Sequence, residues 1–372
     1  MSLIPIAHIT AIECVAQYIL SECHEHVTSS LSTNSELIEK LLNAGLPATQ
    51  PAILTADSQS AGRGQHGRSW QSPKGNLYFS FYHPLTTAKA TFSANILPLT
   101  APITGLLSLC VGQQLANMSI IRQLNRHRLS QSLPNIGVKW VNDVGFYHVV
   151  KSHQPNNMHT SSHFDKVLPY HQSPCHQSPC HQLQFYKLAG ILIEPVQRAG
   201  KRLGVVIGIG INVQNPPTLT SAQQENMGHQ AVGLNSLIDM CNLPNCLPVS
   251  FLPVSPQDLY RPVLMACLNA LLIHDQLICE PKDNGKDKGK YSDEFLYEFA
   301  KVDVLAGKRI KVRSDRLSHF NGDNANDDNT MLTGRVIGID RHGRLQVADD
   351  GGKIHALFTG SIPNAFACDD GR

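Results

Sequence analysis

The chain has 372 residues, of which 42% are hydrophobic and 16% are charged, a composition typical of a globular protein with two or three domains. Its formal net charge of +2 provides no electrostatic attraction to nucleic acid or to an anionic membrane. The longest apolar run is too short to cross a bilayer, and the ten cysteines include no Cys-x-x-Cys pair. These features exclude a membrane-spanning protein, a disulfide scaffold and a zinc ribbon. Because residues 1–5 also lack the features of a signal peptide, we expect a cytoplasmic protein.

The N-terminal residues predict two helices. Residues 1–28 and a second segment that opens at Ser32 both carry apolar side chains at helical spacing, and Gly45 supplies a stop signal. Thr33 and Glu36 have the spacing of a capping box, which favours a purely structural role for the hydroxyl groups at the start of the second helix. The side chains expected to be buried are Ile9, Ile12, Val15, Ile19 and Leu20 in the first helix and Leu37, Ile38, Leu41 and Leu42 in the second.

A glycine- and arginine-rich segment, residues 61–70, lies between two predicted strands at residues 51–56 and 76–82. Its three glycines allow close approach of the backbone to a ligand, and Arg63 and Arg68 can form bidentate contacts with phosphate or carboxylate groups. Together with the tryptophan that follows, they favour a loop that closes over an anionic, partly aromatic ligand such as a nucleotide. A surface turn with a chance charge pair is the alternative. The segment is not a Walker phosphate loop, because no Gly-Lys-Ser/Thr ends it.

Residues 97–115, rich in Ala, Leu and Gly, predict a buried helix, and residues 138–144 predict a short strand that ends in a polar pair. In this strand Lys139 offers a cation for phosphate, and the adjoining Asn142 and Asp143 offer oxygen atoms for Mg²⁺. An Asn-Asp pair is also a common turn, so the segment alone leaves both interpretations open.

Two further strands are predicted at residues 187–194 and 205–213. Lys187 stands at the entrance of the first. Glycines inside the second strand indicate either close approach of a ligand or packing of a helix against the sheet. In the first case, the amide of Asn212 could bind a base or a urea-like group.

Residues 148–184 have a different composition, with seven histidines and a repeated His-Gln-Ser-Pro-Cys unit. Low aliphatic content and abundant polar residues favour a solvated insertion loop. Binding of a soft metal is the alternative at this density of His and Cys.

The C-terminal third predicts a change of architecture. Residues 257–280 carry leucines at helical spacing and predict an amphipathic helix, followed by a charged loop at residues 280–291. Residues 302–372 contain short apolar segments separated by Asp, Gly and Asn turns, a pattern typical of a small antiparallel barrel. The strands expected there are residues 309–312, 334–339, 345–348 and 353–358.

Five of these segments occur in the order found in bacterial-type biotin protein ligases, and the chain resembles that family. The resemblance implies an α+β fold: a class II aminoacyl-tRNA synthetase-like catalytic domain with a mixed sheet at residues 1–301, and a Src-homology-3-like β-barrel at residues 302–372. The matching motifs are Ser32-Thr33-Asn34, Gly62-Arg63-Gly64-x-x-Gly67-Arg68-x-Trp70, Lys139-Trp140-x-Asn142-Asp143, Lys187-Leu188-Ala189-Gly190-Ile191-Leu192-x-Glu194, Gly208-x-Gly210-Ile211-Asn212 and, in the barrel, Gly338-Ile339-Asp340-x-x-Gly343.

The resemblance implies an ATP-dependent ligase that activates biotin as biotinyl-AMP and transfers it to a lysine of the biotin carboxyl carrier protein of acetyl-CoA carboxylase. ATP with Mg²⁺ would serve the first step. DNA binding is not expected, because no N-terminal winged helix precedes the motifs, and a homodimer is compatible with the family. The alternatives are a lipoate–protein ligase of the same superfamily and a non-catalytic, biotin-sensing DNA-binding regulator. Gln65 and His66 stand where many relatives carry arginine, which reduces the positive charge of the loop.

The resemblance also assigns roles to individual residues. Catalysis is assigned to Lys187, Arg63 and Lys139. Biotin binding is assigned to Ser32, Thr33, Asn34, Gln59, Gly62, Arg63, Lys187, Gly190 and Gly208. Binding of ATP and the adenylate is assigned to Arg68, Trp70, Asn142, Asp143, Ile211 and Asn212, with Asp143 as the expected Mg²⁺ ligand.

Overall fold

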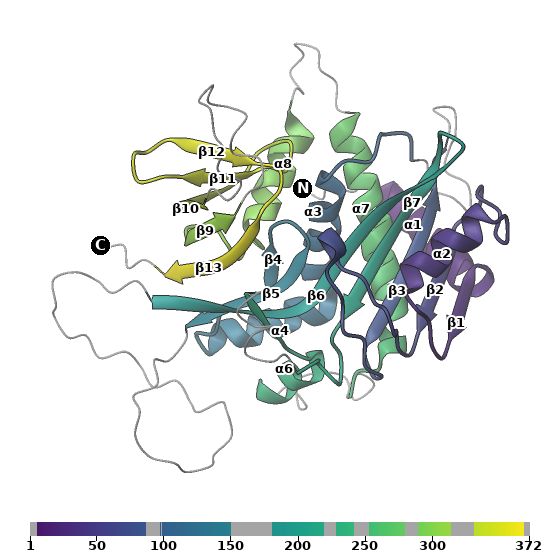
Figure 1. Cartoon of the computed structure of the whole chain (residues 1–372), viewed down its shortest axis with the longest axis horizontal. Coiled ribbons are helices and arrows are strands. Elements are labelled where there is room, and N and C mark those ends of the chain that lie inside the picture. The colour runs from purple at the N-terminus through teal and green to yellow at the C-terminus, as the bar shows by residue number, and fades with distance from the viewer. Residues whose placement is uncertain are drawn as a thin grey trace.

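One mixed sheet forms the framework of the fold and continues into the C-terminal strands (Figure 1). The computed structural model describes residues 6–86, 97, 99–149, 181–218, 228–241, 253–279, 289–313 and 331–367. The main strands of the sheet are β1 (His24–Val27), β2 (Ala52–Ala56), β3 (Leu77–Pro84), β6 (His181–Arg198) and β7 (Lys201–Ile211). They follow the order β1-β2-β3-β7-β6, in which β1 and β2 are parallel and the other neighbours are antiparallel.

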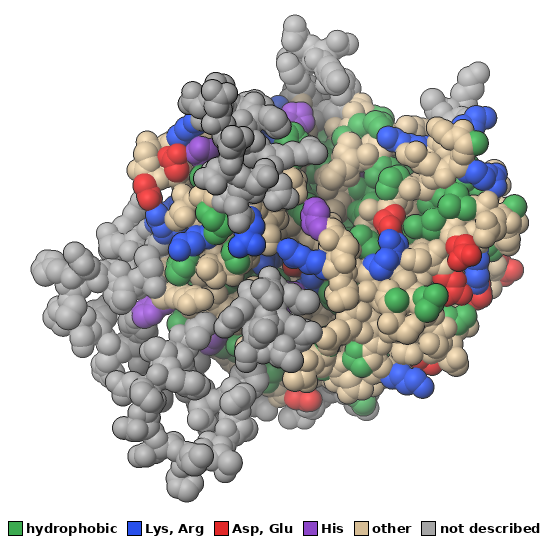
Figure 2. Space-filling view, viewed as in Figure 1, with side chains coloured by type: hydrophobic (Ala, Val, Ile, Leu, Met, Phe, Trp, Pro, Cys, Tyr) green, Lys and Arg blue, Asp and Glu red, His purple; other side chains and the backbone are tan. Residues whose placement is uncertain are grey.

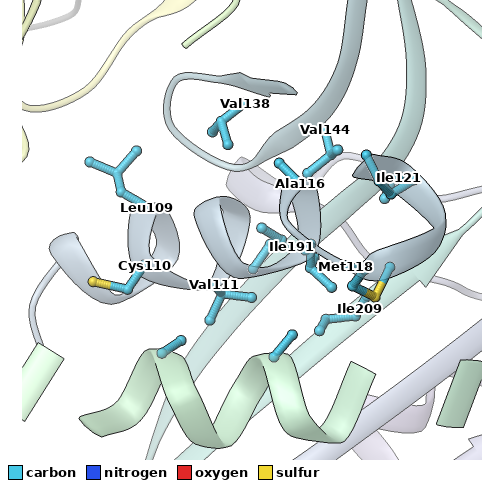
Figure 3. Close-up of a cluster of buried hydrophobic side chains, with 14 of the residues drawn as sticks. Leu109, Cys110, Val111, Ala116, Met118, Ile121, Val138, Val144, Ile191 and Ile209 are labelled. Atoms are coloured by element: carbon cyan, nitrogen blue, oxygen red, sulfur yellow. The ribbon is translucent and has the colours of Figure 1, made fainter. Parts of the chain in front are cut away.

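Helices cover both faces of this sheet because successive strand residues point to opposite sides. Ile53 of β2 belongs to the large core beneath three helices, whereas its neighbour Leu54 packs in a smaller core with Leu37 and Leu41. Figure 3 shows Val111 and its neighbours packed among side chains from the sheet. The helices of the large core are α1 (Ile6–Glu22), α3 (Leu106–Ala116) and α7 (Tyr260–Ile278), and the helix of the smaller core is α2 (Thr33–Leu42).

Strand β6 is the longest strand and joins the other parts of the sheet. Besides β7, it pairs with β5 (Asp143–Val149), which forms a hairpin with β4 (Gly137–Lys139) in which Lys139 lies opposite Asp143. The short strand β8 (His229–Ala231) pairs in parallel with residues 185–187 of β6. The connecting elements are α4 (Ser119–Ser130), α6 (Leu234–Met240) and the 3₁₀ turn η4 (Pro256–Leu259).

The C-terminal strands pair in the antiparallel order β13-β9-β10-β11-β12, and β13 also pairs with the start of β6, where Ala365 lies opposite Leu183. These elements are α8 (Lys290–Ala300), β9 (Arg309–Arg313), β10 (Met331–Ile339), β11 (Leu345–Ala348), β12 (Ile354–Leu357) and β13 (Ser361–Ala367). Within the described residues no pairing joins β12 to β13, so a closed barrel and a domain boundary at residue 302 stay predictions.

Several expected elements are confirmed. The strands predicted at residues 51–56, 76–82, 187–194 and 205–213 are present, and so is the amphipathic helix expected at residues 257–280, with its leucines buried.

Other boundaries are wrong for identifiable reasons. The first helix ends at Glu22, because His24 and His26 instead form part of β1 and contact the hydroxyl of Thr55 at 2.8 and 3.0 Å. The helix expected from residue 97 begins only at Leu106.

The segment at residues 138–144 is the turn of a hairpin and not one strand, because Asp143 begins β5. Residues 148–149 and 181–184 of the predicted insertion belong to β5 and β6, and the rest of that insertion lies outside the described residues. Lys290 and Tyr291, expected in the charged loop, begin α8. Within the part of the chain that the structure describes, no helix has the length and apolarity needed to span a bilayer.

Candidate active site

A cavity of about 400 Å³ lies between residues 61–70, here called the flap, the strands β6 and β7, and the turn before β13. In Figure 2, Lys and Arg side chains gather near the middle of the view, between the C-terminal strands and the main sheet. All five motifs contribute to the cavity, so the structure brings together segments that are far apart in the sequence. The sequence-predicted residues that line it are Ser32, Thr33, Asn34, Gln59, Arg63, Arg68, Trp70, Lys139, Asn142, Asp143, Lys187, Gly190, Gly208 and Asn212.

Three glycines in neighbouring strands make a flat floor for this cavity. Gly190 of β6 pairs with Gly210 of β7, and a Cβ atom at either position would lie 2.8 Å from the ring of Trp70. A Cβ atom at Gly208 would collide with the amide of Asn34. Glycine is therefore needed here so that an indole and an amide can lie directly on the sheet.

Lys187 and Lys139 bring two cations to one end of the cavity. Nζ of Lys187 forms an ion pair with Oδ1 of Asp143 at 2.6 Å. Lys139 is buried, and its Nζ donates to the carbonyl oxygen of Ile362 at 3.3 Å and lies 4.7 Å from the ring centre of Phe185. Two lysines thus surround one carboxylate, which leaves this end positively charged and suited to an anionic ligand.

The pKa values of this group follow from burial and from the neighbouring charges. Burial lowers the pKa of Lys139 to about 8, and the nearby Asp143 only partly opposes this shift. Burial by itself would raise the pKa of Asp143, but Lys187 and Lys139 outweigh it and hold that pKa below its usual range. Asp143 is therefore ionised at neutral pH, and Lys139 can lose its proton at moderately alkaline pH.

The flap is a short hairpin with a 3₁₀ turn, η1 (Gln65–Gly67), at its tip. The backbone N–H of Trp70 donates to the carbonyl of Gly62 at 2.8 Å and closes the base of the flap. The tip contains His66 and Gly67 with positive φ angles of 56° and 71°. Nζ of Lys187 lies 4.9 Å from the ring centre of Trp70, so the indole covers part of the cationic end.

The N-terminus of α2 belongs to a polar cluster that we call the α2 network: Thr33 and Asn34 of α2, Gln59 of the loop after β2, and Ser80 of β3. Both the backbone N–H and the hydroxyl of Thr33 donate to Oε1 of Gln59, at 2.8 and 3.1 Å. Oγ of Ser80 lies 2.8 Å from the Thr33 hydroxyl and 2.5 Å from Oδ1 of Asn34. The predicted capping box is wrong, since Ser32 occupies the N-cap without a side-chain cap bond and the Thr33 hydroxyl bonds to Gln59.

The C-terminal strands form a wall of the cavity that the sequence did not indicate. Arg68 of the flap donates from Nη2 to the hydroxyl of Ser361 at 3.3 Å, and Arg313 lines the cavity from the end of β9. No local motif marks these residues, because pairing between β13 and β6 brings them to the site. Further lining residues without a sequence assignment are Gln65, His66, Ser69, Tyr78, His229, Thr359, Gly360, Ile362 and Pro363.

Two residues assigned from the resemblance, Gly62 and Ile211, do not line the main cavity. Gly62 lines a second, adjacent cavity and supports the base of the flap, where a Cβ atom would collide with the carbonyl of Trp70. Ile211 is buried in the core and does not line the main cavity. Asn212 reaches the cavity, but its Nδ2 already donates to the carbonyl of Lys187 at 3.2 Å.

The donor set around Asp143 fits a Mg²⁺ ion that arrives with a nucleotide. Asp143 is the only acidic side chain among the described residues that line the cavity. Nδ2 of the adjacent Asn142 donates to the carbonyl of Ile191 at 3.1 Å, and this hydrogen bond fixes the orientation of the Asn142 amide. Mg²⁺ commonly takes one or two protein carboxylates and completes its shell with phosphate oxygens and water. The described residues contain no cluster of three or more His, Cys, Asp or Glu that could hold a metal ion alone.

Comparison with solved structures identifies the fold. The structure has a TM-score of 0.52 with the biotin protein ligase from Aquifex aeolicus in complex with biotin and ATP, at 18% identity, and the match covers 93% of this chain and 100% of the other. A mutant of that Aquifex ligase in complex with biotin gives a TM-score of 0.50 at 17% identity, covering 92% and 98% of the two chains. The chain therefore has the α+β fold of the biotin protein ligases.

Sequence comparison defines the family. The pattern of the Biotin/lipoate A/B protein ligase family matches residues 27–212, half of the chain, and the chain belongs to that family. The Bifunctional ligase/repressor BirA of Escherichia coli is 28% identical over 183 residues, covering 49% of this chain and 38% of that protein. The same-named protein of Salmonella typhimurium is 28% identical over 185 residues. These matches span less than half the length of the curated relatives.

Proposed function

We propose that the chain is an ATP-dependent ligase that activates biotin as biotinyl-AMP and then transfers the biotinyl group to a lysine of a carrier protein. The observation that carries this proposal is the convergence of Lys139, Lys187 and the flap arginines on one glycine-floored cavity next to the α2 network. Such a cavity can hold two anions close together at one end and a small polar ring at the other.

In the first step, a carboxylate oxygen of biotin attacks the α-phosphorus of ATP. A new P–O bond forms, the bond to the β-phosphate oxygen breaks, and pyrophosphate leaves. Lys187 and Lys139 reduce the repulsion between the two anions and stabilise the charge on the α-phosphate, an effect that commonly contributes a factor of about 100 or more per donor. Mg²⁺, held in part by Asp143, would neutralise phosphate charge when bound.

The opposite end of the cavity suits the ureido ring of biotin. Thr33, Asn34 and Gln59 present amide and hydroxyl groups that can donate and accept hydrogen bonds. The dithiolane ring of lipoate offers no such partners, so the α2 network favours biotin within a family that also includes lipoate ligases. Trp70, in turn, offers a flat surface on which adenine can stack.

In the second step, the ε-amine of the carrier lysine attacks the acyl carbon of biotinyl-AMP. A C–N bond forms, the C–O bond to the phosphate breaks, AMP leaves and the amine loses a proton. The mixed anhydride is sensitive to water, which gives the closed flap a purpose. We propose a biotin carboxyl carrier protein, such as that of acetyl-CoA carboxylase, as the acceptor, and the ATP-rich cytoplasm as the place of reaction.

The test is ATP-dependent pyrophosphate release with biotin, lipoate or octanoate as the acid, followed by the mass of a carrier domain after incubation. We expect pyrophosphate release and a mass increase with biotin alone. Release with lipoate or octanoate and none with biotin would refute the assignment, and a salt-dependent gel shift without acyl transfer would favour a DNA-binding regulator.

A further inference from the structure

Glu194 lies where the glycine floor of the cavity ends. Residues 190, 192 and 194 of β6 share one face of the sheet, because side chains alternate along a strand. Gly190 supports Trp70, and Leu192 pairs with Gly208, which supports Asn34. Glu194 is thus the first acidic side chain beyond the floor on that face, and none of the roles proposed above uses it.

One oxygen of Glu194 joins the flap to helix α2. Its Oε2 atom accepts a hydrogen bond from Nη2 of Arg63 at 2.6 Å and another from Nδ2 of Asn34 at 2.9 Å. The side chains of Arg63 and Glu194 are 42% and 24% exposed, and an ion pair with this exposure contributes little to the free energy of unfolding. A role in stability therefore does not account for the arrangement.

The same network reaches the other end of the flap. Asn34 belongs to the α2 network, in which Nε2 of Gln59 donates to the hydroxyl of Ser72 at 2.9 Å. The hydroxyl of Ser72 donates to the carbonyl of Trp70 at 3.1 Å. The groups proposed to recognise the ureido ring are therefore connected to both ends of the flap, at one end through Glu194.

We propose that Glu194 is a positioning residue, which holds Arg63 over the cavity and couples recognition of the ligand at α2 to closure of the flap. Arg63 uses Nη2 for Glu194, and the guanidinium has five N–H donors in all, so the rest of the fork is available to an anionic ligand. The identity of that ligand, biotin and its adenylate, rests on the function proposed above, whereas the attachment of the flap does not.

The attachment can be tested without any ligand, by amide hydrogen exchange of residues 62–70. Glu194→Gln keeps an acceptor for Asn34 but removes the charge that holds Arg63, so we expect exchange in the flap to become about threefold faster or more. The matched control is Glu25→Gln, which removes an ion pair of the same 2.6 Å length to Lys40, a pair that does not line the cavity. Flap exchange as slow in Glu194→Gln as in Glu25→Gln would overturn the proposal.

The coupling is tested with biotin as the probe. We expect Glu194→Gln to raise the KM for biotin about tenfold, the scale of one charge-assisted hydrogen bond, with kcat changed less than twofold. In an Arg63→Ala background, Glu194→Gln should have no further effect, because Glu194 acts through Arg63. A lower KM in Glu194→Gln would instead identify Glu194 as a competitor of the ligand and refute the positioning role. If the unaltered protein releases no pyrophosphate with biotin, the proposed function fails, and the exchange experiment still decides whether Glu194 holds the flap.

Discussion

The ion pair between Lys187 and Asp143 gives the lysine proposed for adenylation a structural partner as well. The side chains are only 12% and 16% exposed, so the two charges stabilise each other, and Lys139 is a second, weaker partner of Asp143. Removing one member of such a pair leaves an uncompensated charge in a poorly solvated place, which costs about 3 kcal/mol or more. A lysine that contacted only the ligand would not have this cost.

We therefore expect Lys187→Met to lower the free energy of unfolding by about 3 kcal/mol and pyrophosphate release by about 100-fold. Adding Asp143→Asn removes the carboxylate that has lost its ion pair with Lys187, so the double variant should regain most of the stability but not the activity. Urea denaturation and pyrophosphate release measure the two effects, with Asp143→Asn alone as the control. Near-native turnover in either variant with Met at position 187 would remove this lysine from the site.

Lys139 predicts a dependence of activity on pH. Its pKa is lowered by burial from 10.5 to about 8, so the free protein loses this ammonium charge as the pH rises through about 8. We expect kcat/KM for ATP to fall about tenfold per pH unit above that value, because the charge that attracts phosphate disappears. Lys139→Arg should keep its charge and remove this decline, whereas an identical profile in both proteins would contradict the assignment.

The lowered pKa of Lys139 also determines how this residue changes the free energy of unfolding with pH. Between about pH 8 and 10.5 the unfolded chain binds more protons at this position than the folded chain does. The contribution of Lys139 to stability therefore rises with pH across this window. Below about pH 8 the lysine is charged in both states, and its burial is then fully unfavourable.

At the scale of elements, the flap depends on contacts with other parts of the chain. It is closed at its base by the bond between Trp70 and Gly62, and it is attached elsewhere by Arg63 to Glu194 and by Arg68 to Ser361. The contact of Arg68 is one long hydrogen bond to a neutral hydroxyl, which a ligand can readily outcompete, whereas we expect the ion pair between Arg63 and Glu194 to persist when the ligand binds. Motion of the flap should therefore accompany binding.

The tryptophan fluorescence of the protein should report this motion. Trp140 also lines the cavity, but it is only 4% exposed and its Nε1 donates to the carbonyl of Gly343 at 2.9 Å, so we expect its fluorescence to change much less than that of Trp70. We expect a larger change in fluorescence with biotin and ATP together than with biotin alone, and loss of this change in Trp70→Phe. A fluorescence change that persists unaltered in Trp70→Phe would show that Trp70 does not report binding.

Arg63→Ala should release free biotinyl-AMP, which is measured as labelling of bystander lysines.

The histidine-rich segment connects two strands that are already neighbours. Val149 at the end of β5 lies opposite Leu183 near the start of β6, so a short linker can join them. We expect replacement of residues 150–180 by a Gly/Ser linker to leave biotinylation within about twofold, and each halving of loop length to change the closure free energy by only about 0.6 kcal/mol. Loss of activity together with loss of a stoichiometric bound metal would support the alternative that this segment is a metal site.

Sequence reasoning identified the elements whose signal is local. Gly190, Gly208 and Gly210 stand out inside apolar strands, and the arginines and the tryptophan of the flap stand out by composition, so most of the cavity lining was predictable. It failed for β1, whose His-Glu-His-Val sequence has no apolar alternation and is a strand because it pairs with β2. The sequence also did not reveal the contacts of Glu194 with Arg63 and of Ser361 with Arg68, because the partners are distant in the sequence.

At the scale of the whole molecule, the C-terminal strands are built into the site. Strand β13 pairs with β6, and the carbonyl of Ile362 accepts a hydrogen bond from the buried Lys139. The turn at Gly343 packs so closely on α3 that a Cβ atom there would lie 2.9 Å from the side chain of Leu109. Residues of β9 and β13 belong to the same buried core as α3 and α7. Lys139 therefore depends on the C-terminal strands for its hydrogen bond and for part of its burial.

Removal of residues 302–372 should thus abolish adenylation and not merely weaken recognition of the carrier protein. The truncated chain would expose part of the core and leave the ammonium of Lys139 without the Ile362 carbonyl, so we expect a lower melting temperature and pyrophosphate release reduced by about 100-fold or more. Because truncation alone could act through stability, Ser361→Ala supplies the second variant. It removes only the contact to Arg68, and we expect unchanged melting with a higher KM for ATP. If the truncated chain still releases pyrophosphate with biotin at the native rate, the C-terminal strands do not belong to the adenylation site, and their role would be confined to the second half-reaction.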